Sequence, residues 1–247
     1  MAYQSDPFTP VFGADGAVDS GLRAFLGGVY LKLAAGLVLS AVAAWCVADD
    51  PNLRDLFFVG AGGQVTRFTI WGLAFVLAPL ALLLLASGTL RHPTARGSGA
   101  LYWSIAALVG SSMGLLVLTY TGASLVSTFL MTAAAFGGLS LWGYATKRNL
   151  TALGNFMVTA LCGLIVAMLI NLFLRSPGAN LVINLIGVFI FAGLIAADTQ
   201  RLKMIYYQSD DPEMMAAASN YGALTLYLNF INLFELLLSF SRSRSRR

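Results

Sequence analysis

Seven apolar stretches, each about twenty residues long, recur along the chain and match the length that a helix needs to cross a bilayer. Lipid offers the backbone no hydrogen-bond partners, so a segment of this kind must satisfy its own amide groups as a helix. The sequence therefore predicts an integral membrane protein with an all-α fold of seven transmembrane helices. The expected spans are 27–48, 67–87, 101–121, 125–145, 152–174, 180–198 and 222–240.

The composition supports a membrane protein and leaves no room for a second folded domain. Charged residues make up 11% of the chain and apolar residues 58%, whereas charged residues are about a quarter of a soluble domain. The connections between the spans are short. We therefore expect a polar, disordered N-terminal tail over 1–26, a single membrane domain over 27–240 and a basic C-terminal tail over 241–247.

The distribution of Lys and Arg predicts the orientation. Three arginines lie in the loops on one side of an alternating seven-span arrangement, and eight basic residues lie on the side of the N-terminus. By the positive-inside rule the N-terminus is cytoplasmic. The basic residues near span ends anchor the chain at the membrane surface, so nucleic acid is not expected as a partner. The eight are Arg23, Lys32, Arg91, Arg96, Lys147, Arg148, Arg201 and Lys203.

The basic C-terminal tail conflicts with this orientation. Arg242, Arg244, Arg246 and Arg247 would lie outside if 222–240 crosses the membrane completely. The sequence leaves two possibilities open: the tail is placed against the rule, or the last segment re-enters and returns to the cytoplasm.

Small residues within the spans predict close contacts between helices. Gly110 and Gly114 lie on the third span, and Gly137, Gly138 and Gly143 lie on the fourth. Glycines at such spacing allow helix backbones to approach one another. We also expect a tight turn at 121–124, which makes the third and fourth spans an antiparallel hairpin.

No pattern in the chain supports an enzyme or a bound cofactor. The segment 110–114 matches the G-x-S-x-G nucleophile motif, but it lies in an apolar helix, and the only histidine, His92, is in a basic loop. A retinal Schiff base is excluded because the last span contains no lysine. Cys46 and Cys162 fall inside spans without metal-ligand spacing, and we interpret them as small buried apolar residues.

Polar residues inside the spans carry most of the functional information, because each is costly in lipid. Only two carboxylates, Asp198 and Glu235, fall within apolar segments. Asn229 and Asn232 are three residues apart and share one face of the last span. Asn184 precedes Asp198 by fourteen residues, about four helical turns, and so shares its face.

Two interpretations of Asp198 remain open at this point. Asp198 could cap the end of the sixth span and pair with Arg201 or Lys203. Alternatively, it is the titratable element of a polar pathway between the sixth and seventh spans, lined by asparagines.

Several segments together resemble the Bax-inhibitor-1/YccA family. The similarity extends from about Phe25 to Ser239, with the order of the spans intact. It is most specific where the run that contains Asp198 is combined with the segment that contains Asn229. The matching segments are 120–124, 136–144, 146–150, 197–203 and 223–234.

This resemblance implies three helix pairs around the last helix and, in at least some members, a pH-sensitive calcium leak. In bacterial relatives it also implies association with a membrane-bound ATP-dependent protease. In calcium-leak members, two aspartates of the last two helices share a proton and close the cytoplasmic end. Asp198 matches the first, whereas Asn229 stands at the second. Arg91 is the nearest match to an arginine of that cluster, and the acid that some relatives carry in the second span has no counterpart here.

The departure at Asn229 has a physical consequence. Two carboxylates in contact cannot both ionise cheaply, which makes pH a switch. The amide of Asn229 removes that repulsion and can donate a hydrogen bond to ionised Asp198, and Arg91 would favour the ionised form further. Glu235 is about 120° around the helix from Asn229 and is a poor substitute. We therefore expect gating near neutral pH to be weak or shifted toward acid.

The favoured hypothesis is a calcium or other cation leak channel in a bacterial inner membrane. Asp198 is its gate and weak metal ligand, Asn229 and Arg91 complete the gate, and Asn232 and Asn184 line the pathway. One carboxylate with amides would bind Ca²⁺ only weakly, as a leak requires. The alternatives are a non-conducting regulator that binds a membrane protease or another membrane partner, and a proton-coupled transporter.

Overall fold

The computed structural model describes residues 20–61, 64–86, 94–208 and 211–244. Within these residues, six helices are long and apolar enough to cross a membrane. They are α1 (Ser20–Asp49), α4 (Ala95–Ser112) with its continuation α5 (Gly114–Thr119), α6 (Gly122–Ala145), α7 (Thr151–Leu174), α8 (Pro177–Gln208) and α9 (Pro212–Arg244). The chain is a multi-pass, helical membrane protein.

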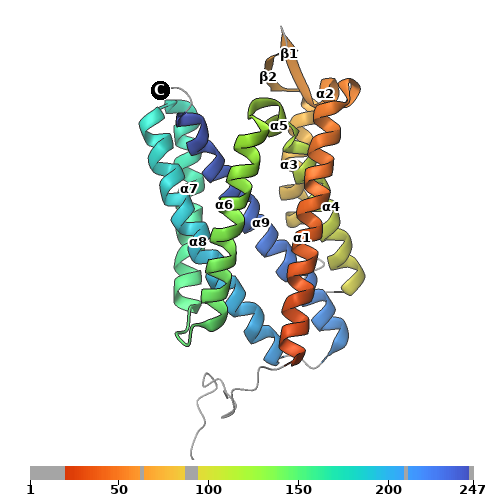
Figure 1. Cartoon of the computed structure of the whole chain (residues 1–247), viewed down its shortest axis with the longest axis vertical. Helices are drawn as coiled ribbons and strands as arrows, with labels where there is room; N and C mark the ends of the chain where they lie inside the picture. The colour runs from red at the N-terminus through yellow and green to blue at the C-terminus, as the bar shows by residue number, and fades with distance from the viewer. Residues whose placement is uncertain (1–19, 62–63, 87–93, 209–210, 245–247) are drawn as a thin grey trace, which may run out of the picture.

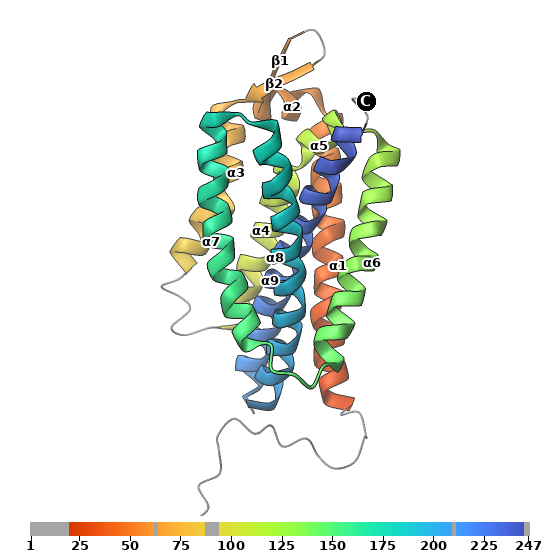
Figure 2. The same cartoon turned by 90° about the vertical axis from the view of Figure 1, so that its left-hand side faces the viewer.

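A further apolar helix, α3, falls in the second predicted span. It covers Ile70–Ala86, and its 17 residues make it shorter than the other six. Between α1 and α3 the chain forms a short helix, α2 (Pro51–Phe57), and an antiparallel hairpin of β1 (Phe58–Ala61) and β2 (Gln64–Phe68). The long helices run along the long axis of the molecule, and the hairpin lies at the end opposite the start of α1 (Figures 1 and 2).

Helix α9 lies at the centre of the bundle. It packs against α1, α4, α6 and α8, whereas α3 packs on α4 and α7 packs on α8. In its most apolar stretch, 61% of the residues of α9 are buried, compared with 6% for α7. Figure 1 shows α9 crossing the bundle obliquely between the other helices. Lipid-exposed apolar side chains therefore belong to the outer helices, and α9 is the helix on which a polar pathway can be built.

Three of the five span glycines lie at close helix contacts, as predicted. A Cβ at Gly110 would collide with the backbone of Ser40, one at Gly114 would lie 2.9 Å from Val47 Cγ1, and one at Gly143 would collide with the backbone of Ala196. Cβ atoms at the other two predicted positions, Gly137 and Gly138, would meet no atom within 4 Å. The prediction was wrong for these two, because they lie on the open face of α6.

The predicted turn between the third and fourth spans is confirmed. Helix α5 ends at Thr119, and the Thr121 hydroxyl accepts a hydrogen bond from the backbone amide of Ser124 at 3.2 Å, which caps the start of α6. A side-chain cap of this kind satisfies an amide that has no partner inside the helix.

Helix ends differ from the predicted spans where polar residues continue a helix. Residues 20–26, expected in the tail, form the first turns of α1, because Leu22 and Leu26 are buried against the bundle. The predicted connection 199–221 is mostly helical: α8 continues to Gln208 and α9 begins at Pro212. Asp198 therefore lies inside α8 and does not cap its end.

Two other expectations need correction. The β-hairpin was not expected, and it delays the second apolar helix to Ile70. Directly before the hairpin, Phe57 at the end of α2 packs on Phe75 of α3, with 4.7 Å between ring centroids. The cysteines were expected to be buried, but Cys46 and Cys162 are free and exposed on the outer surface of their helices. Apolar character alone does not distinguish a residue that faces lipid from one that faces the core.

Candidate functional site

The two residues on which the resemblance depends meet between the last two helices. The side-chain amide of Asn229 on α9 donates a hydrogen bond to Oδ2 of Asp198 on α8, at 2.7 Å. Asn229 is buried, with 6% of its surface exposed, and Asp198 is half-buried. This is the bond expected from the amide at the position where calcium-leak members carry a second aspartate. An amide donor of this kind stabilises the ionised carboxylate.

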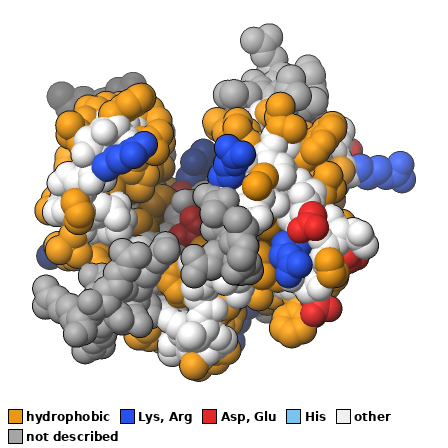
Figure 3. Space-filling model, turned by 90° about the horizontal axis from the view of Figure 1, so that it is seen from above, with side chains coloured by type: hydrophobic (Ala, Val, Ile, Leu, Met, Phe, Trp, Pro, Cys, Tyr) orange, Lys and Arg blue, Asp and Glu red, His pale blue; other side chains and the backbone are white. Residues whose placement is uncertain are grey.

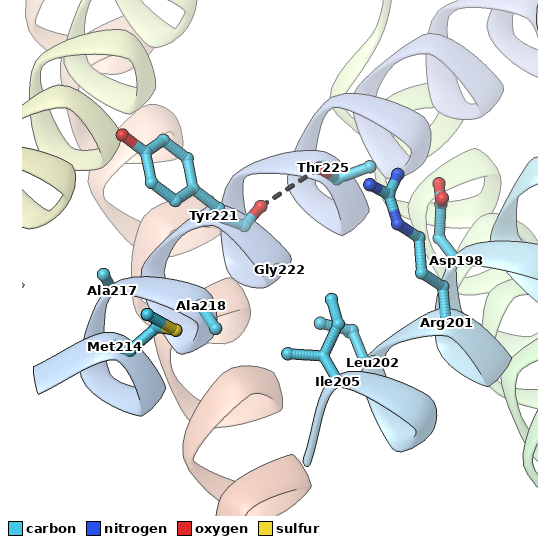
Figure 4. A pocket seen from close by; sticks show the side chains of 10 residues that line it. All are labelled: Asp198, Arg201, Leu202, Ile205, Met214, Ala217, Ala218, Tyr221, Gly222 and Thr225. Carbon is cyan, nitrogen blue, oxygen red and sulfur yellow. Dashed lines mark hydrogen bonds between the residues drawn. The ribbon is translucent and has the colours of Figure 1, made fainter. Parts of the chain in front are cut away.

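A pocket of about 400 Å³ opens beside Asp198. It lies near the end of the bundle where α1 begins, because its walls are the C-terminal part of α8 and the N-terminal part of α9 (Figure 4). Its surface combines one carboxylate and one guanidinium with mostly small and apolar side chains. The lining residues are Asp198, Arg201, Leu202, Ile205, Met214, Ala217, Ala218, Tyr221, Gly222 and Thr225.

The two cations suggested as partners of Asp198 behave differently. Arg201 is exposed, and its guanidinium lies on the same side of the pocket as Asp198 (Figure 4), although no ion pair within 4 Å joins them among the described residues. Lys203 turns toward α6, where its ammonium donates to the carbonyl of Tyr144 at 3.4 Å and lies 5.1 Å from the centre of the Tyr144 ring. The direct partner of Asp198 is therefore an amide on α9.

The other predicted residues are spread along the bundle. The side-chain amide of Asn232 bonds to the carbonyl of Leu228 in its own helix at 2.7 Å, so it does not reach Asp198. Asn184 does face α9, where it donates to the Ser239 hydroxyl at 2.8 Å, about 21 Å along α8 from Asp198. Arg91 lies outside the described residues.

A second polar network was not recognised from the sequence. The ammonium of Lys32 on α1 donates to the Ser219 hydroxyl at 2.9 Å and to the side-chain oxygen of Asn220 at 2.7 Å. The amide of Asn220 in turn donates to the carbonyl of Ala95 at 2.9 Å, which joins α1, α4 and α9. Lys32 was counted only as an orientation marker. Its position inside an apolar span was the signal that could have indicated a buried contact.

Halfway along the same helices, a buried hydroxyl pair links α1 to α9. The hydroxyl oxygens of Ser40 and Tyr227 lie 2.7 Å apart, and the Ser40 hydroxyl also donates a hydrogen bond to the carbonyl of Ala106 on α4 at 2.8 Å. Buried polar groups of this kind fix the relative positions of helices, because leaving one without a partner is costly.

Gln200, in the same matching segment 197–203 as Asp198, has a structural role. The side chain of Gln200 accepts a hydrogen bond from the backbone amide of Leu150 at 2.7 Å and donates to the carbonyl of Arg148 at 2.8 Å. Gln200 thereby holds the connection between α6 and α7 against α8. These two bonds join the segments 146–150 and 197–203 in the structure.

The chemistry available at Asp198 is electrostatic. The described part of the chain contains no group of three or more His, Cys, Asp or Glu residues that could hold a metal ion tightly. A single carboxylate with neighbouring amide and hydroxyl oxygens suits weak, reversible contact with a hard cation. An ionised group at the centre of a bilayer costs about 2.5–3.5 kcal/mol, so a buried carboxylate indicates a hydrated or polar environment.

Known proteins match this chain over nearly its whole length. The family model described as inhibitor of apoptosis-promoting Bax1 matches residues 22–246. An uncharacterized protein of Caulobacter vibrioides is 51% identical over 94% of this chain and 93% of its own length. Inner membrane protein YbhL of Escherichia coli is 38% identical over 89% of this chain and 91% of its own length. The extent of these matches places the chain in the Bax inhibitor-1 family.

Proposed function

We propose that this protein is a cation leak channel with calcium as its permeant ion and Asp198 as its gate. The observation that carries the proposal is the hydrogen bond between Asp198 and Asn229 beside a pocket at the α8–α9 interface. A carboxylate attracts a cation, and its pairing with a neutral amide leaves the negative charge available. The absence of a tight ligand set in the described residues agrees with permeation, since a tightly bound ion would leave slowly.

The proposed topology has seven crossings, with α3 as the second. Its 17 residues reach about 26 Å, slightly less than the hydrocarbon core, which a local thinning of the bilayer can accommodate. The proposed location is a bacterial inner membrane, which the name of the relative, inner membrane protein YbhL, supports. The N-terminus is placed in the cytoplasm by the positive-inside rule alone. Helix α9 continues without interruption to Arg244 and ends opposite the start of α1 (Figure 1), so the end of α9 lies on the outer side in this topology.

The packing supports a central role for α9 in this arrangement. Four helices contact α9 directly, and α3 and α7 cover the outside of α4 and α8. These contacts support the proposed arrangement, in which three helix pairs surround the last helix. Movement of α8 against α9 would break the Asp198–Asn229 bond and widen the passage next to the pocket.

The expected pH dependence of the leak follows from the side-chain amide of Asn229. Because Asn229 does not repel an ionised Asp198, gating near neutral pH is weak and the response moves toward acid. Asn229→Asp would restore a pair of carboxylates that cannot both ionise cheaply, and should therefore produce a pH-dependent leak near neutrality.

Calcium entry into liposomes that contain the purified protein tests this function. We expect Asp198→Asn to lower the flux about tenfold, equivalent to about 1.4 kcal/mol of lost cation stabilisation. The exchange variant Asp198→Asn with Asn229→Asp is the matched control, because it moves the carboxylate from α8 to α9 and keeps an amide as its partner. It should retain more flux than Asp198→Asn alone.

One pattern of results would contradict the mechanism. This is a leak that responds to pH near neutrality in the native chain, is lost in Asp198→Asn and is unchanged in Asn229→Asp. A folded native protein that conducts no cation at any pH would instead favour the alternative of a regulator that binds a membrane-bound ATP-dependent protease or another membrane partner.

A further inference from the structure

The face of α9 that carries Glu235 is unusually open for the central helix of a bundle. Residues on most sides of α9 are buried, including Tyr227, Leu233 and Leu238. One stripe at spacings of three and four residues differs, because Thr225 and Glu235 are exposed and the others are half-buried. Residues spaced in this way share one face of a helix. The stripe consists of Tyr221, Thr225, Leu228, Asn232, Glu235 and Ser239.

The stripe is continuous with the pocket beside Asp198. Tyr221 and Thr225 line that pocket, and Ser239, four turns further along, receives the hydrogen bond from Asn184 on α8. The stripe from Thr225 to Ser239 covers about 21 Å. Five of its six residues carry a hydroxyl, amide or carboxyl group, which is an unusual density for a central membrane helix.

Glu235 lies on the open face of α9. Its side chain is exposed, although α9 is the central helix of the bundle. The residues on either side of it are covered: Leu236 is buried close to Gly187 of α8, and Phe234 lies 6.4 Å from Phe129 of α6 between ring centroids. Figure 3, a view onto the end that carries the β-hairpin, shows a hollow between two masses of side chains, with acidic side chains visible inside it.

No bond within the described residues accounts for the carboxylate of Glu235. Asp198 has the amide of Asn229, whereas no hydrogen bond or ion pair engages Glu235 in the described ranges. A carboxylate facing lipid would be costly, and water or a cation in the groove would satisfy it. By its spacing in the sequence, Glu235 is a poor substitute for an aspartate at position 229. In the structure Glu235 lies about 9 Å further along α9 than Asn229.

We propose that Glu235 is a second cation-binding residue, at the floor of a hydrated groove along α9, which receives a hard divalent cation such as Ca²⁺ from the end of the bundle opposite Asp198. The inference rests on the proposed leak function, because the groove and the pocket would be successive parts of one pathway. The side-chain oxygen of Asn232, one turn before Glu235, supplies a further oxygen atom, because only the nitrogen of that amide bonds to Leu228.

Carbodiimide labelling of the native protein in membranes tests the groove and the ion without relying on flux. A water-soluble carbodiimide activates accessible carboxyl groups, glycinamide converts them to amides, and mass spectrometry of peptides measures each site. Glu213, exposed at the start of the same helix, is the matched control. We expect Glu235 to react, and Ca²⁺ to slow its labelling about threefold at a concentration twice the dissociation constant, with Glu213 unaffected.

Each outcome decides one part of the inference. An unreactive Glu235 would overturn the hydrated groove, and a reactive Glu235 that is indifferent to Ca²⁺ would overturn the cation site. In flux assays, Glu235→Gln should lower calcium entry at least about threefold, while Glu213→Gln leaves it unchanged; equal flux in the two variants would contradict a role in permeation. If the native protein conducts no calcium, the leak function fails, but the labelling still decides whether Glu235 binds the ion.

Discussion

The contact between α6 and α8 at Gly143 yields a quantitative prediction. A Cβ added there would lie 2.9 Å from both the carbonyl carbon and the Cα of Ala196, and closer still to its carbonyl oxygen, whereas ordinary contacts begin at 3.4 Å. The two backbones would have to separate by at least about 0.5 Å, since neither atom belongs to a flexible side chain. Overpacking of this kind costs about 1–3 kcal/mol, so Gly143→Ala should lower the free energy of unfolding by that amount.

The same helix supplies two matched controls. Cβ atoms at Gly137 and Gly138 would meet nothing within 4 Å, and alanine is the better helix former by up to about 1 kcal/mol. Gly137→Ala and Gly138→Ala should therefore be neutral or slightly stabilising. Reversible unfolding in mixed micelles, followed by tryptophan fluorescence, measures all three variants. If Gly143→Ala unfolds within about 0.5 kcal/mol of the two controls, a precision typical of such comparisons, the close approach of α6 and α8 is refuted.

Two further substitutions test the polar contacts between helices. Ser40→Ala leaves partners of the buried hydroxyl network unsatisfied and should cost about 1–3 kcal/mol in the same unfolding assay; a loss no larger than that of the exposed Ser127→Ala would contradict the assigned network. Gln200→Ala removes both side-chain bonds to the connection between α6 and α7, so hydrogen exchange at 146–150 should become faster than in Gln208→Ala; equal exchange would show that Gln200 does not hold this connection.

The sequence predicts the membrane helices well because each must satisfy its own backbone in lipid. Six of the expected spans fall on long helices, and the turn before α6 is placed correctly. The helix ends are less predictable. Hydrophobicity reports the part that contacts lipid, whereas α8 and α9 extend past the apolar residues because Leu202 and Ala217 remain buried in contacts between helices.

At the candidate site, the sequence predicts the hydrogen-bond partner of Asp198 but not which other polar residues lie open along α9. The expected contact of Asp198 with Asn229 is present in the structure. It could be predicted because the resemblance matches both residues to a known pair, and because a charge in lipid needs a polar partner. The network around Lys32 and the open position of Glu235 depend on which face of a helix meets which neighbour. That information comes from the crossing of α9 between four helices and is not contained in the spacing of residues along one helix.

Calcium entry into liposomes, compared between the native protein and Asp198→Asn at equal amounts of folded protein, tests the central claim most directly. The account predicts that the native protein raises calcium entry well above that of protein-free liposomes, and that the substitution removes most of the increase. Native flux equal to the protein-free rate, or flux that is the same with and without the Asp198 carboxylate, would contradict it.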